Sequence, residues 1–427
     1  MKKFLALILA LVMALSLVAC GGGDNNTNGD NGDDANTEGK KVKVGFITLH
    51  DENSTYDLNF INGAKEAIAA LGLTEDDYIL KTNVPEGQEC YEAAVDMVDA
   101  GCNIIFADSF GHEPYMIQAA QEFPEVQFCH STGTRAHTEG LANYHNAFAS
   151  IYEGRYLAGI AAGLKLNAMI EAGDIKAEEA KMGYVGAFTY AEVVSGYTSF
   201  FLGARSVCPT VTMDVTFTGS WYDEALEKEG AQLLIDKGCN LISQHADSLG
   251  APTACENAKV PNVSYNGSTK EAGPNTYIIS SRINWAPYYQ YAIQCVIDGK
   301  AIDADWTGTL ATGSVVLTEL NTDVAAAGTQ EAIDAAIAKL ESGELHVFDC
   351  ATFTTKADDT MNPFKVDFLK VDADGHITSY LADVDTDEAY TGDTEVVENG
   401  YFAESAKRSA PYFDLQIDGI NLLNTAM

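Results

Sequence analysis

Val42-Lys43-Val44-Gly45-Phe46-Ile47-Thr48 is a short, mostly apolar run of strand length, and the chain after it changes to a helical period. Ile61, Ala64, Ile68 and Leu71 recur three or four positions apart, which is typical of the buried face of a helix. A buried strand followed by such a helix is typical of the opening unit of a parallel sheet. This stretch therefore predicts an α/β fold.

The same alternation continues toward the C-terminus. The first series continues with a helix around 91–98, a strand at 103–107, a helix ending near 123 and a strand at 126–130. After a long helix over 151–166, the order restarts at 181–186. A helix at 195–207, a strand at 210–218, a helix at 223–237, a strand at 240–244, a short helix and a strand at 262–265 follow. We expect two lobes, each a mostly parallel sheet flanked by helices.

Chain length also predicts two lobes, because the roughly 385 residues after the first 41 exceed what one hydrophobic core usually supports. We expect residues 42–150 to form the first lobe, with a return segment at about 280–310, and 151–280 to form the second. Residues 311–427 should complete the lobes and add an acidic extension. In that part we predict a helix at 331–340, a closing strand at 345–350 and strand-like structure over 365–399.

The N-terminus resembles a bacterial lipoprotein signal. Lys2 and Lys3 precede the apolar stretch Phe4–Leu17, and Leu17-Val18-Ala19-Cys20 reads as a lipobox. The resemblance implies cleavage of residues 1–19 and acylation of Cys20, which would hold the protein on the outer face of the cytoplasmic membrane. Residues 20–41, rich in Gly, Asn and Asp, should be a flexible linker. The alternative is an ordinary cleaved signal with an incidental cysteine.

Composition excludes several partners. With 25 Lys and Arg against 62 Asp and Glu, the formal charge of −37 argues against nucleic acid or anionic lipid as a partner. Apart from Cys20, the eight cysteines lack the paired spacing of a zinc or redox site, so we expect no metal and no cofactor. Their disulfide state stays open. We expect a monomer.

Aromatic and polar residues follow the predicted strands. Ligands of parallel sheets bind beyond the carboxyl ends of the strands, so these segments are candidates for a binding site. The segments are 50–57, 108–111, 188–190, 220–223, 245–248 and 266–268. Flat rings beside a few fixed hydrogen-bonding groups suit a planar heteroaromatic ligand, stacked on its faces and recognised at its edges.

Several of these segments carry a family resemblance. Gly45–Gly63, Ile104–Phe128 and Tyr152–Gly159 resemble the basic membrane protein family of lipoproteins, the substrate-binding components of ABC importers with a type I periplasmic-binding fold. The segments 219–223, 244–248 and 284–289 resemble a branch associated with purine-type ligands. The resemblance implies an ABC permease and ATPase as partners and a purine nucleobase or nucleoside as ligand. Some relatives take riboflavin or another planar heterocycle, which remains an alternative.

Position by position, the resemblance implies a stacking role for Tyr56 and an edge or ribose contact for Asp57. Elsewhere the sequence departs from the family. Ala246-Asp247-Ser248 replaces an Ala-Gly-Gly loop, and Tyr265–Ser268 replaces an Asp-rich turn that binds ribose. A ribose-binding lysine also has no clear equivalent near residues 280–284. These departures favour a free nucleobase such as adenine.

The candidate ligand-binding residues are Tyr56, Asp57, Ser109, Phe110, Phe188, Trp221, His245, Asp247, Asn266 and Trp285. Structural roles are open for several of them. Trp221 could cap the hinge between the lobes, and His245 could be a satisfied structural histidine. Asp247 and Ser248 could cap the following helix. Trp285 could anchor the helix that begins at Pro287 instead of lining the cleft.

We expect binding by closure of the two lobes about strand crossovers near 145–150 and 265–285, which would bury the ligand and present a joined surface to the permease. A sensor that presents ligand to a signalling receptor would use the same fold. An enzyme is disfavoured, because the sequence has no nucleophile elbow, metal signature or phosphate loop.

Overall fold

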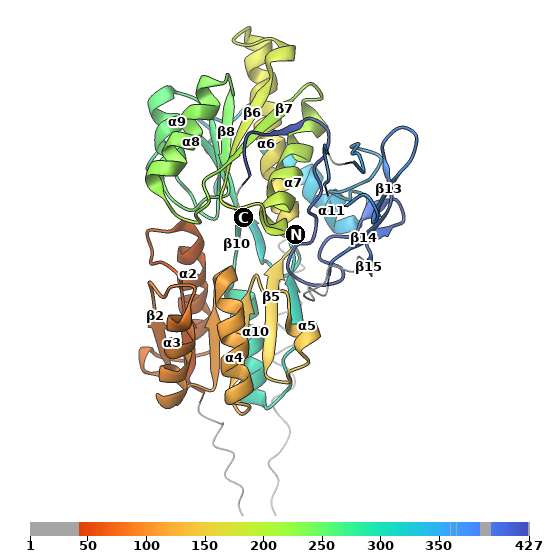
Figure 1. The fold of residues 1–427 in the computed structure, drawn as a ribbon. Helices are drawn as coiled ribbons and strands as arrows, with labels where there is room; N and C mark the ends of the chain where they lie inside the picture. Colours follow the sequence, from red (N-terminus) through yellow and green to blue (C-terminus); the bar gives the residue numbers. More distant parts are fainter. Residues whose placement is uncertain (1–41, 359, 364, 385–393, 426–427) are drawn as a thin grey trace, which may run out of the picture. The chain divides into compact units, whose positions relative to one another are not determined.

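The computed structural model describes residues 42–358, 360–363, 365–384 and 394–425. Within them the chain forms two largely parallel sheets flanked by helices, which confirms the predicted α/β class (Figure 1). The expected signal peptide and linker, Cys20 included, lie outside the described residues. No helix in the described part is both long enough and apolar enough to cross a bilayer.

The first lobe is built on a six-stranded sheet in the order β11-β5-β4-β3-β1-β2, with every pair parallel. Its strands are β1 (Val44–Ile47), β2 (Tyr78–Lys81), β3 (Ile104–Ala107), β4 (Gln127–Ser131), β5 (Tyr144–Ala149) and β11 (Asp305–Gly308). Its helices are α2 (Thr55–Ala70), α3 (Gln88–Asp99), α4 (Glu113–Glu122), α5 (Ala136–Glu139) and α10 (Ala286–Asp298).

Strand β1 shows why its sequence forms a strand. Phe46 packs in the core that α2 and α10 cover, whereas Ile47 packs in the core on the side of α3 and α4. Side chains alternate along a strand, so a strand covered on both faces is apolar throughout. β2 was not assigned from the sequence, and its four residues are only half-buried at the edge of the sheet.

The second lobe is built on a seven-stranded sheet in the order β12-β10-β9-β8-β6-β7-β18, in which only β12 runs antiparallel to its neighbour. Its strands are β6 (Lys181–Gly186), β7 (Thr212–Phe217), β8 (Leu241–Gln244), β9 (Asn262–Tyr265), β10 (Tyr277–Ile283), β12 (Val315–Leu317) and β18 (Ile420–Leu422). Its helices are α6 (Ile151–Ala172), α7 (Ala191–Val207), α8 (Glu224–Asp236), α9 (Gly250–Ala258) and α11 (Thr329–Ser342).

Three strand-to-strand or strand-to-helix connections cross between the lobes. The first joins β5 to α6, the second joins β10 to α10, and the third joins β11 to β12. The crossovers expected near 145–150 and 265–285 correspond to the first two, and the return segment expected over about 280–310 ends beside the third. The return to the first lobe starts after β10, because β10 itself pairs with β9 in the second sheet.

The C-terminal part packs against the second lobe (Figure 1, blue). It carries the small sheet of β13 (Leu369–Val371), β14 (Ile377–Ala382) and β15 (Thr394–Glu395), and the pair β16 (Val397–Glu398) and β17 (Tyr401–Phe402). The predicted helix at 331–340 is present as α11. The predicted closing strand at 345–350 is wrong, since this segment is irregular and makes one isolated bridge, from Asp349 to Tyr401. Its apolar residues are instead buried by aromatic packing, as where Phe348 stacks on Phe413 at 4.3 Å.

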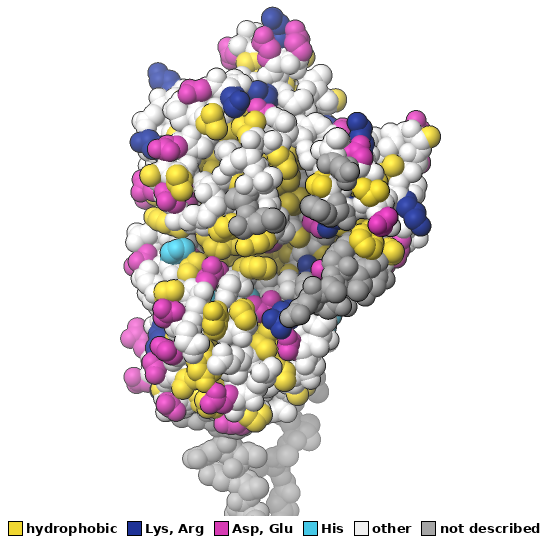
Figure 2. Space-filling model, viewed as in Figure 1, with side chains coloured by type: hydrophobic (Ala, Val, Ile, Leu, Met, Phe, Trp, Pro, Cys, Tyr) yellow, Lys and Arg dark blue, Asp and Glu magenta, His cyan; other side chains and the backbone are white. Residues whose placement is uncertain are grey.

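The surface of the described part agrees with the composition. Acidic side chains are spread over both lobes on the face shown in Figure 2, and hydrophobic side chains gather across its middle. The eight described cysteines are all buried with free thiols.

Candidate functional site

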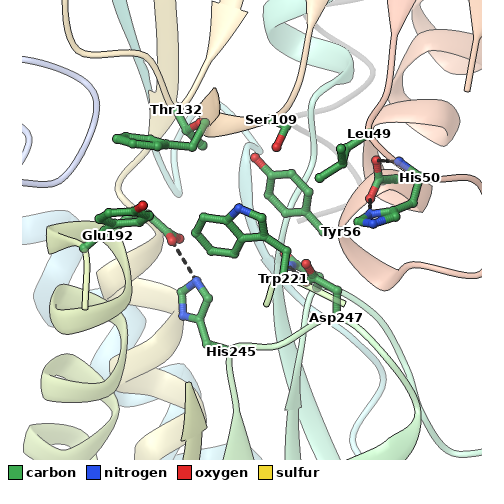
Figure 3. Close-up of a pocket in the computed structure, with 13 residues that line it drawn as sticks. Leu49, His50, Tyr56, Ser109, Thr132, Glu192, Trp221, His245 and Asp247 are labelled. Atoms are coloured by element: carbon green, nitrogen blue, oxygen red, sulfur yellow. Dashed lines mark hydrogen bonds and ion pairs between the residues drawn. The ribbon is translucent and has the colours of Figure 1, made fainter. Parts of the chain in front are cut away.

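A cavity lies where the strand order of both sheets reverses. β1 lies between β2 and β3, and β6 lies between β7 and β8. Ligands of open parallel sheets bind beyond the carboxyl ends of the strands at such switch points. The empty space here, counted together with the solvent at its open mouth, is about 480 Å³. Figure 3 shows residues that surround it. Its walls are Leu49, His50, Tyr56, Asp57, Ser109, Phe110, Thr132, Tyr190, Glu192, Trp221, His245, Asp247 and Asn266.

Aromatic rings form much of the wall. The Tyr56 hydroxyl donates a hydrogen bond to the backbone oxygen of Asp108 at 2.8 Å, which holds the ring at the start of α2. Phe110 from the first lobe stacks on Tyr190 from the second, with ring centroids 4.8 Å apart. Trp221 contributes a large ring to the same space (Figure 3). Such rings can cover both faces of a flat ligand.

Asp57 lines the cavity, but its own loop occupies both of its oxygens. Oδ1 accepts from the backbone N–H of His50 at 2.8 Å, and Oδ2 accepts from the Ser54 hydroxyl at 2.6 Å and lies 3.3 Å from Nδ1 of His50. Burial by itself raises the pKa of this carboxyl, but these hydrogen bonds outweigh it and lower the pKa below its ordinary value. Asp57 thus holds the turn between β1 and α2.

The Asp247 carboxyl is buried and accepts few hydrogen bonds. Its side chain accepts one long hydrogen bond, from Nδ2 of Asn266 at 3.4 Å. Burial, and then the nearby charges of Asp57 and Glu227, raise the pKa of this carboxyl well above its ordinary value. A buried acceptor with so few donors is suited to N–H groups of a ligand.

The lobes touch each other beside this cavity. The backbone N–H of Thr55 donates to the backbone oxygen of Asp247 at 3.1 Å, and Nδ2 of Asn59 donates to the backbone oxygen of Asn266 at 2.6 Å. Each bond joins α2 of the first lobe to a loop of the second. The lobes are therefore closed on one another at this site.

Ser109 and Thr132 are the small hydroxyl residues of the wall. The Ser109 hydroxyl donates to Glu86 at 2.5 Å, which leaves its oxygen as an acceptor. The Thr132 hydroxyl oxygen is buried and has no partner within the described residues. A buried polar atom without a partner costs free energy, and a ligand could supply the missing bond.

His245 belongs to a chain of polar contacts in the second lobe. Its Nε2 lies 2.7 Å from Oε2 of Glu192, and its Nδ1 lies 3.2 Å from the hydroxyl of Tyr184. Tyr184 in turn accepts from Nη2 of Arg155 at 2.6 Å. His245 thus positions an acid that faces the cavity (Figure 3).

Two predicted site residues do not line the cavity. Trp285 has 1% of its surface exposed and stacks on Phe60 at 4.3 Å in the core of the first lobe, where it precedes α10. The whole Trp285 ring is buried by packing. This agrees with the alternative role, in which Trp285 anchors the following helix. Phe188 lies behind the wall, against Trp221 and Tyr190, and supports those rings.

The other eight predicted residues are brought together in the cavity wall. Leu49, His50, Thr132, Tyr190 and Glu192 join them, although the candidate set lacked them. His50 and Tyr190 lay in segments flagged as strand ends, and Glu192 follows Tyr190 by two positions in the first turn of α7. Extending the candidate segment 188–190 to residue 192 would have included Glu192.

The helix-capping alternative for Asp247 is not what the structure shows. α9 begins at Gly250, and the Ser248 hydroxyl oxygen accepts from the backbone N–H of Gly250 at 3.0 Å. Ser248 therefore supports the start of α9. The Asp247 carboxyl is left beside Asn266.

Two sheet-based lobes that close over a cavity at their switch points define a solute-binding protein of the type I periplasmic-binding fold. Residues 46–344 match the model of the Bmp family, described as ABC transporter substrate-binding protein PnrA-like. The chain belongs to this family. The family therefore implies a small-molecule ligand, a transporter permease as partner and a place outside the cytoplasm.

Individual relatives agree with this assignment. The chain is 31% identical over 316 residues to a purine-binding protein of Brucella abortus (strain 2308), a match that covers 72% of this chain and 83% of that protein. It is 33% identical over 261 residues to an ABC transporter protein of Haloferax volcanii whose name gives glucose binding as provisional, covering 60% of this chain and 62% of that one. The solved structure of an ABC transporter solute-binding protein from Aeropyrum pernix K1 shares the fold, with a TM-score of 0.60, 18% identity and coverage of 72% and 93%.

Proposed function

We propose that this protein captures a purine nucleobase, with adenine the favoured ligand, and presents it to the permease of an ABC importer. The observation that carries the proposal is a cavity between two touching lobes, which combines Tyr56, Phe110, Tyr190 and Trp221 with buried hydrogen-bond acceptors. Rings of this kind stack on a base, and the acceptors can pair with its N–H groups.

The charges of the cavity narrow the ligand class. Asp57, Glu192 and Asp247 are acidic, and none of the described residues that line the cavity is Lys or Arg. A phosphate group would enter a negative field without a counter-charge, so nucleotides are disfavoured. A neutral base with several N–H donors fits these walls, and the purine-binding relative from Brucella abortus supports this class.

The ligand can be identified directly. Mass spectrometry of what co-purifies should be followed by calorimetry against adenine, guanine, adenosine, guanosine, inosine, riboflavin and glucose. We expect adenine to bind with a Kd below roughly 10 µM. Glucose tests the function named for the relative from Haloferax volcanii. Tight binding of glucose, with no purine bound below that level, would overturn the proposal.

Capture requires no chemical change in the ligand. The polar groups of the site hold loops and accept hydrogen bonds, and we propose that the ligand leaves as it entered. Incubation with adenine followed by mass spectrometry should recover adenine unchanged. Deaminated or otherwise converted product would instead indicate an enzyme.

We further propose that the mature protein is a monomer anchored by acylated Cys20. The support is the lipobox at Leu17–Cys20 and the acidic body, which has little affinity of its own for anionic lipid. Cys20→Ser should leave folding intact and move the protein from the membrane fraction to the soluble fraction. A Cys20→Ser protein that stays in the membrane pellet would rule out the lipid as the main tether.

A further inference from the structure

Arg155 is a buried positive charge. None of its surface is exposed, and its guanidinium donates to the Tyr184 hydroxyl at 2.6 Å and to the backbone oxygen of Gln244 at 3.3 Å. The ring of Tyr265 lies 4.5 Å from it. In the described part of the chain, the contacts of Arg155 are hydroxyls, backbone oxygens and rings instead of a carboxylate. A buried charge needs compensating partners. Here those partners are polar groups, which form further hydrogen bonds of their own.

The first hydrogen bond in this series has a fixed direction, and we assign the directions of the others to match it. A guanidinium can only donate, so the Tyr184 oxygen accepts from Arg155 and its own proton is available for Nδ1 of His245. With Nδ1 as acceptor, the neutral ring carries its proton on Nε2. Nε2–H then donates to Oε2 of Glu192 at 2.7 Å.

The imidazole ring in this chain is also held by packing. A Cβ added to Gly196 of α7 would come within 3.1 Å of Nδ1 of His245, so the glycine is what lets the ring lie against this helix. The Tyr265 ring contacts it from another direction, at 4.8 Å. His245 thus has little freedom to turn, and Glu192 is held in one place.

Only one carboxylate oxygen of Glu192 takes part in this series of hydrogen bonds. Oε1 has no hydrogen bond within the described residues, and the residue lines the cavity beside Trp221 (Figure 3). The acid is nearly buried, with 13% of its side chain exposed. A fixed, nearly buried acceptor attracts an N–H group and repels a carbonyl oxygen placed opposite it.

We propose that Glu192 determines which purines this protein accepts, by pairing with an exocyclic amine, and that Arg155, Tyr184 and His245 are its positioning residues. This inference rests on the proposed purine-binding function. Amino-purines such as adenine present two N–H groups at this position, whereas hypoxanthine presents a carbonyl oxygen. The fixed position of Glu192 therefore favours adenine over hypoxanthine.

Calorimetry with adenine and with hypoxanthine tests the inference on four forms of the protein: wild type, Glu192→Gln, Tyr184→Phe and the control Glu229→Gln, which changes an exposed acid on α8. Wild type should prefer adenine by at least about 10-fold, since a hydrogen bond to a charged group is worth about 1.5–3 kcal/mol. Glu192→Gln should narrow the preference to within about 3-fold, because an amide can also donate to a carbonyl oxygen. Glu229→Gln should keep the wild-type preference.

Tyr184→Phe separates positioning from general support. It keeps the ring and removes the hydroxyl between Arg155 and His245. If the chain positions Glu192, adenine affinity should fall more than hypoxanthine affinity, so that their ratio drops. An equal loss for both ligands would mean that Tyr184 only supports the fold.

The outcomes distinguish this inference from the proposed function. Purine binding by wild type with an unchanged adenine-to-hypoxanthine ratio in Glu192→Gln would overturn the role of Glu192 alone. No purine binding by wild type would overturn the proposed function itself. If Glu192→Gln does not fold, Glu192→Asp keeps the charge and withdraws it by one methylene. It should lower adenine affinity by about 3-fold or more without lowering hypoxanthine affinity, and equal losses for both ligands would contradict the inference.

Discussion

The two walls of the cavity use similar residue types in different ways. In the first-lobe wall (Tyr56, Asp57, Ser109, Phe110 and Thr132), most polar groups are engaged by their own lobe: Asp57 by the His50–Ser54 loop, Ser109 by Glu86 and Tyr56 by the backbone of Asp108. The Thr132 hydroxyl is the exception among these residues. In the second-lobe wall (Glu192, Trp221, His245 and Asp247), Asp247 has one long hydrogen bond and Glu192 has one free oxygen.

This difference distinguishes groups that shape the cavity from groups that are available to bind the ligand. Groups whose hydrogen bonds are satisfied internally hold a rigid surface, whereas buried acceptors without donors lose free energy until a ligand arrives. We therefore expect the acids of the second-lobe wall to provide most of the recognition of the ligand's edge, whereas the first-lobe wall contributes mainly shape and stacking, with the Thr132 hydroxyl also open to a ligand.

Asp247→Ala should weaken adenine binding by about 10- to 150-fold, because a charge-assisted hydrogen bond in a closed cleft is worth about 1.5–3 kcal/mol. Calorimetry measures it. Asp223→Ala is the matched control, since Asp223 caps α8 by accepting from the backbone N–H of Leu226 at 2.9 Å and does not line the cavity. It should cost about 1 kcal/mol of stability and leave affinity unchanged. Equal affinities for Asp247→Ala and wild type would show that the second-lobe wall does not recognise the ligand through this acid.

Tyr56→Ala should weaken adenine binding by about 5- to 150-fold, because stacking on a base is worth about 1–3 kcal/mol. Tyr56→Phe keeps the ring and loses only the hydrogen bond to the Asp108 backbone, so its affinity should stay within about 3-fold of wild type. The same calorimetric titration serves for both. If the Phe variant loses as much as the Ala variant, the hydroxyl and its position matter more than stacking.

Asp57→Ala should change ligand affinity by less than about 3-fold and reduce the free energy of unfolding by about 1.5–3 kcal/mol, because it removes the acceptor for the His50 backbone and the Ser54 hydroxyl. Chemical denaturation measures the second quantity and calorimetry the first. A large loss of affinity with normal stability would contradict the proposed contrast and make Asp57 a ligand-binding residue.

Asp247→Asn should stabilise the ligand-free protein at neutral pH. Because burial raises the pKa of Asp247 above its ordinary 3.8, its protonated form stabilises the fold below pH 3.8, and this contribution is lost as pH rises through the folded-state pKa. The gain in Tm of Asp247→Asn over wild type should therefore grow with pH, by roughly 2–4 °C for each kcal/mol relieved. Asp99→Asn, at an exposed acid of α3, should show no such trend. A gain that is independent of pH would contradict the assignment.

Much of the fold could be predicted because its signals are local. β1 and β3 are apolar on both faces, and α2 carries its apolar residues at a helical period. Residues 345–350 show where this reasoning failed, since an apolar segment can be buried by irregular packing as well as by a strand. β2 was missed for the opposite reason, because a half-buried edge strand has a weak apolar pattern.

The α/β class, the order of the two series, the family resemblance and the region of the site could all be predicted from the sequence, because periodicity and strand-end positions are properties of neighbouring residues. The folded structure was needed to show that Trp285 belongs to the core, that the hydrogen bonds of Asp57 are made within its own loop, and that Arg155, Tyr184 and His245 are linked to Glu192. Some of these roles depend on contacts between residues as far apart in the sequence as Phe60 and Trp285. The hydrogen bonds that a carboxylate can still accept are known only when all of its neighbours are in place.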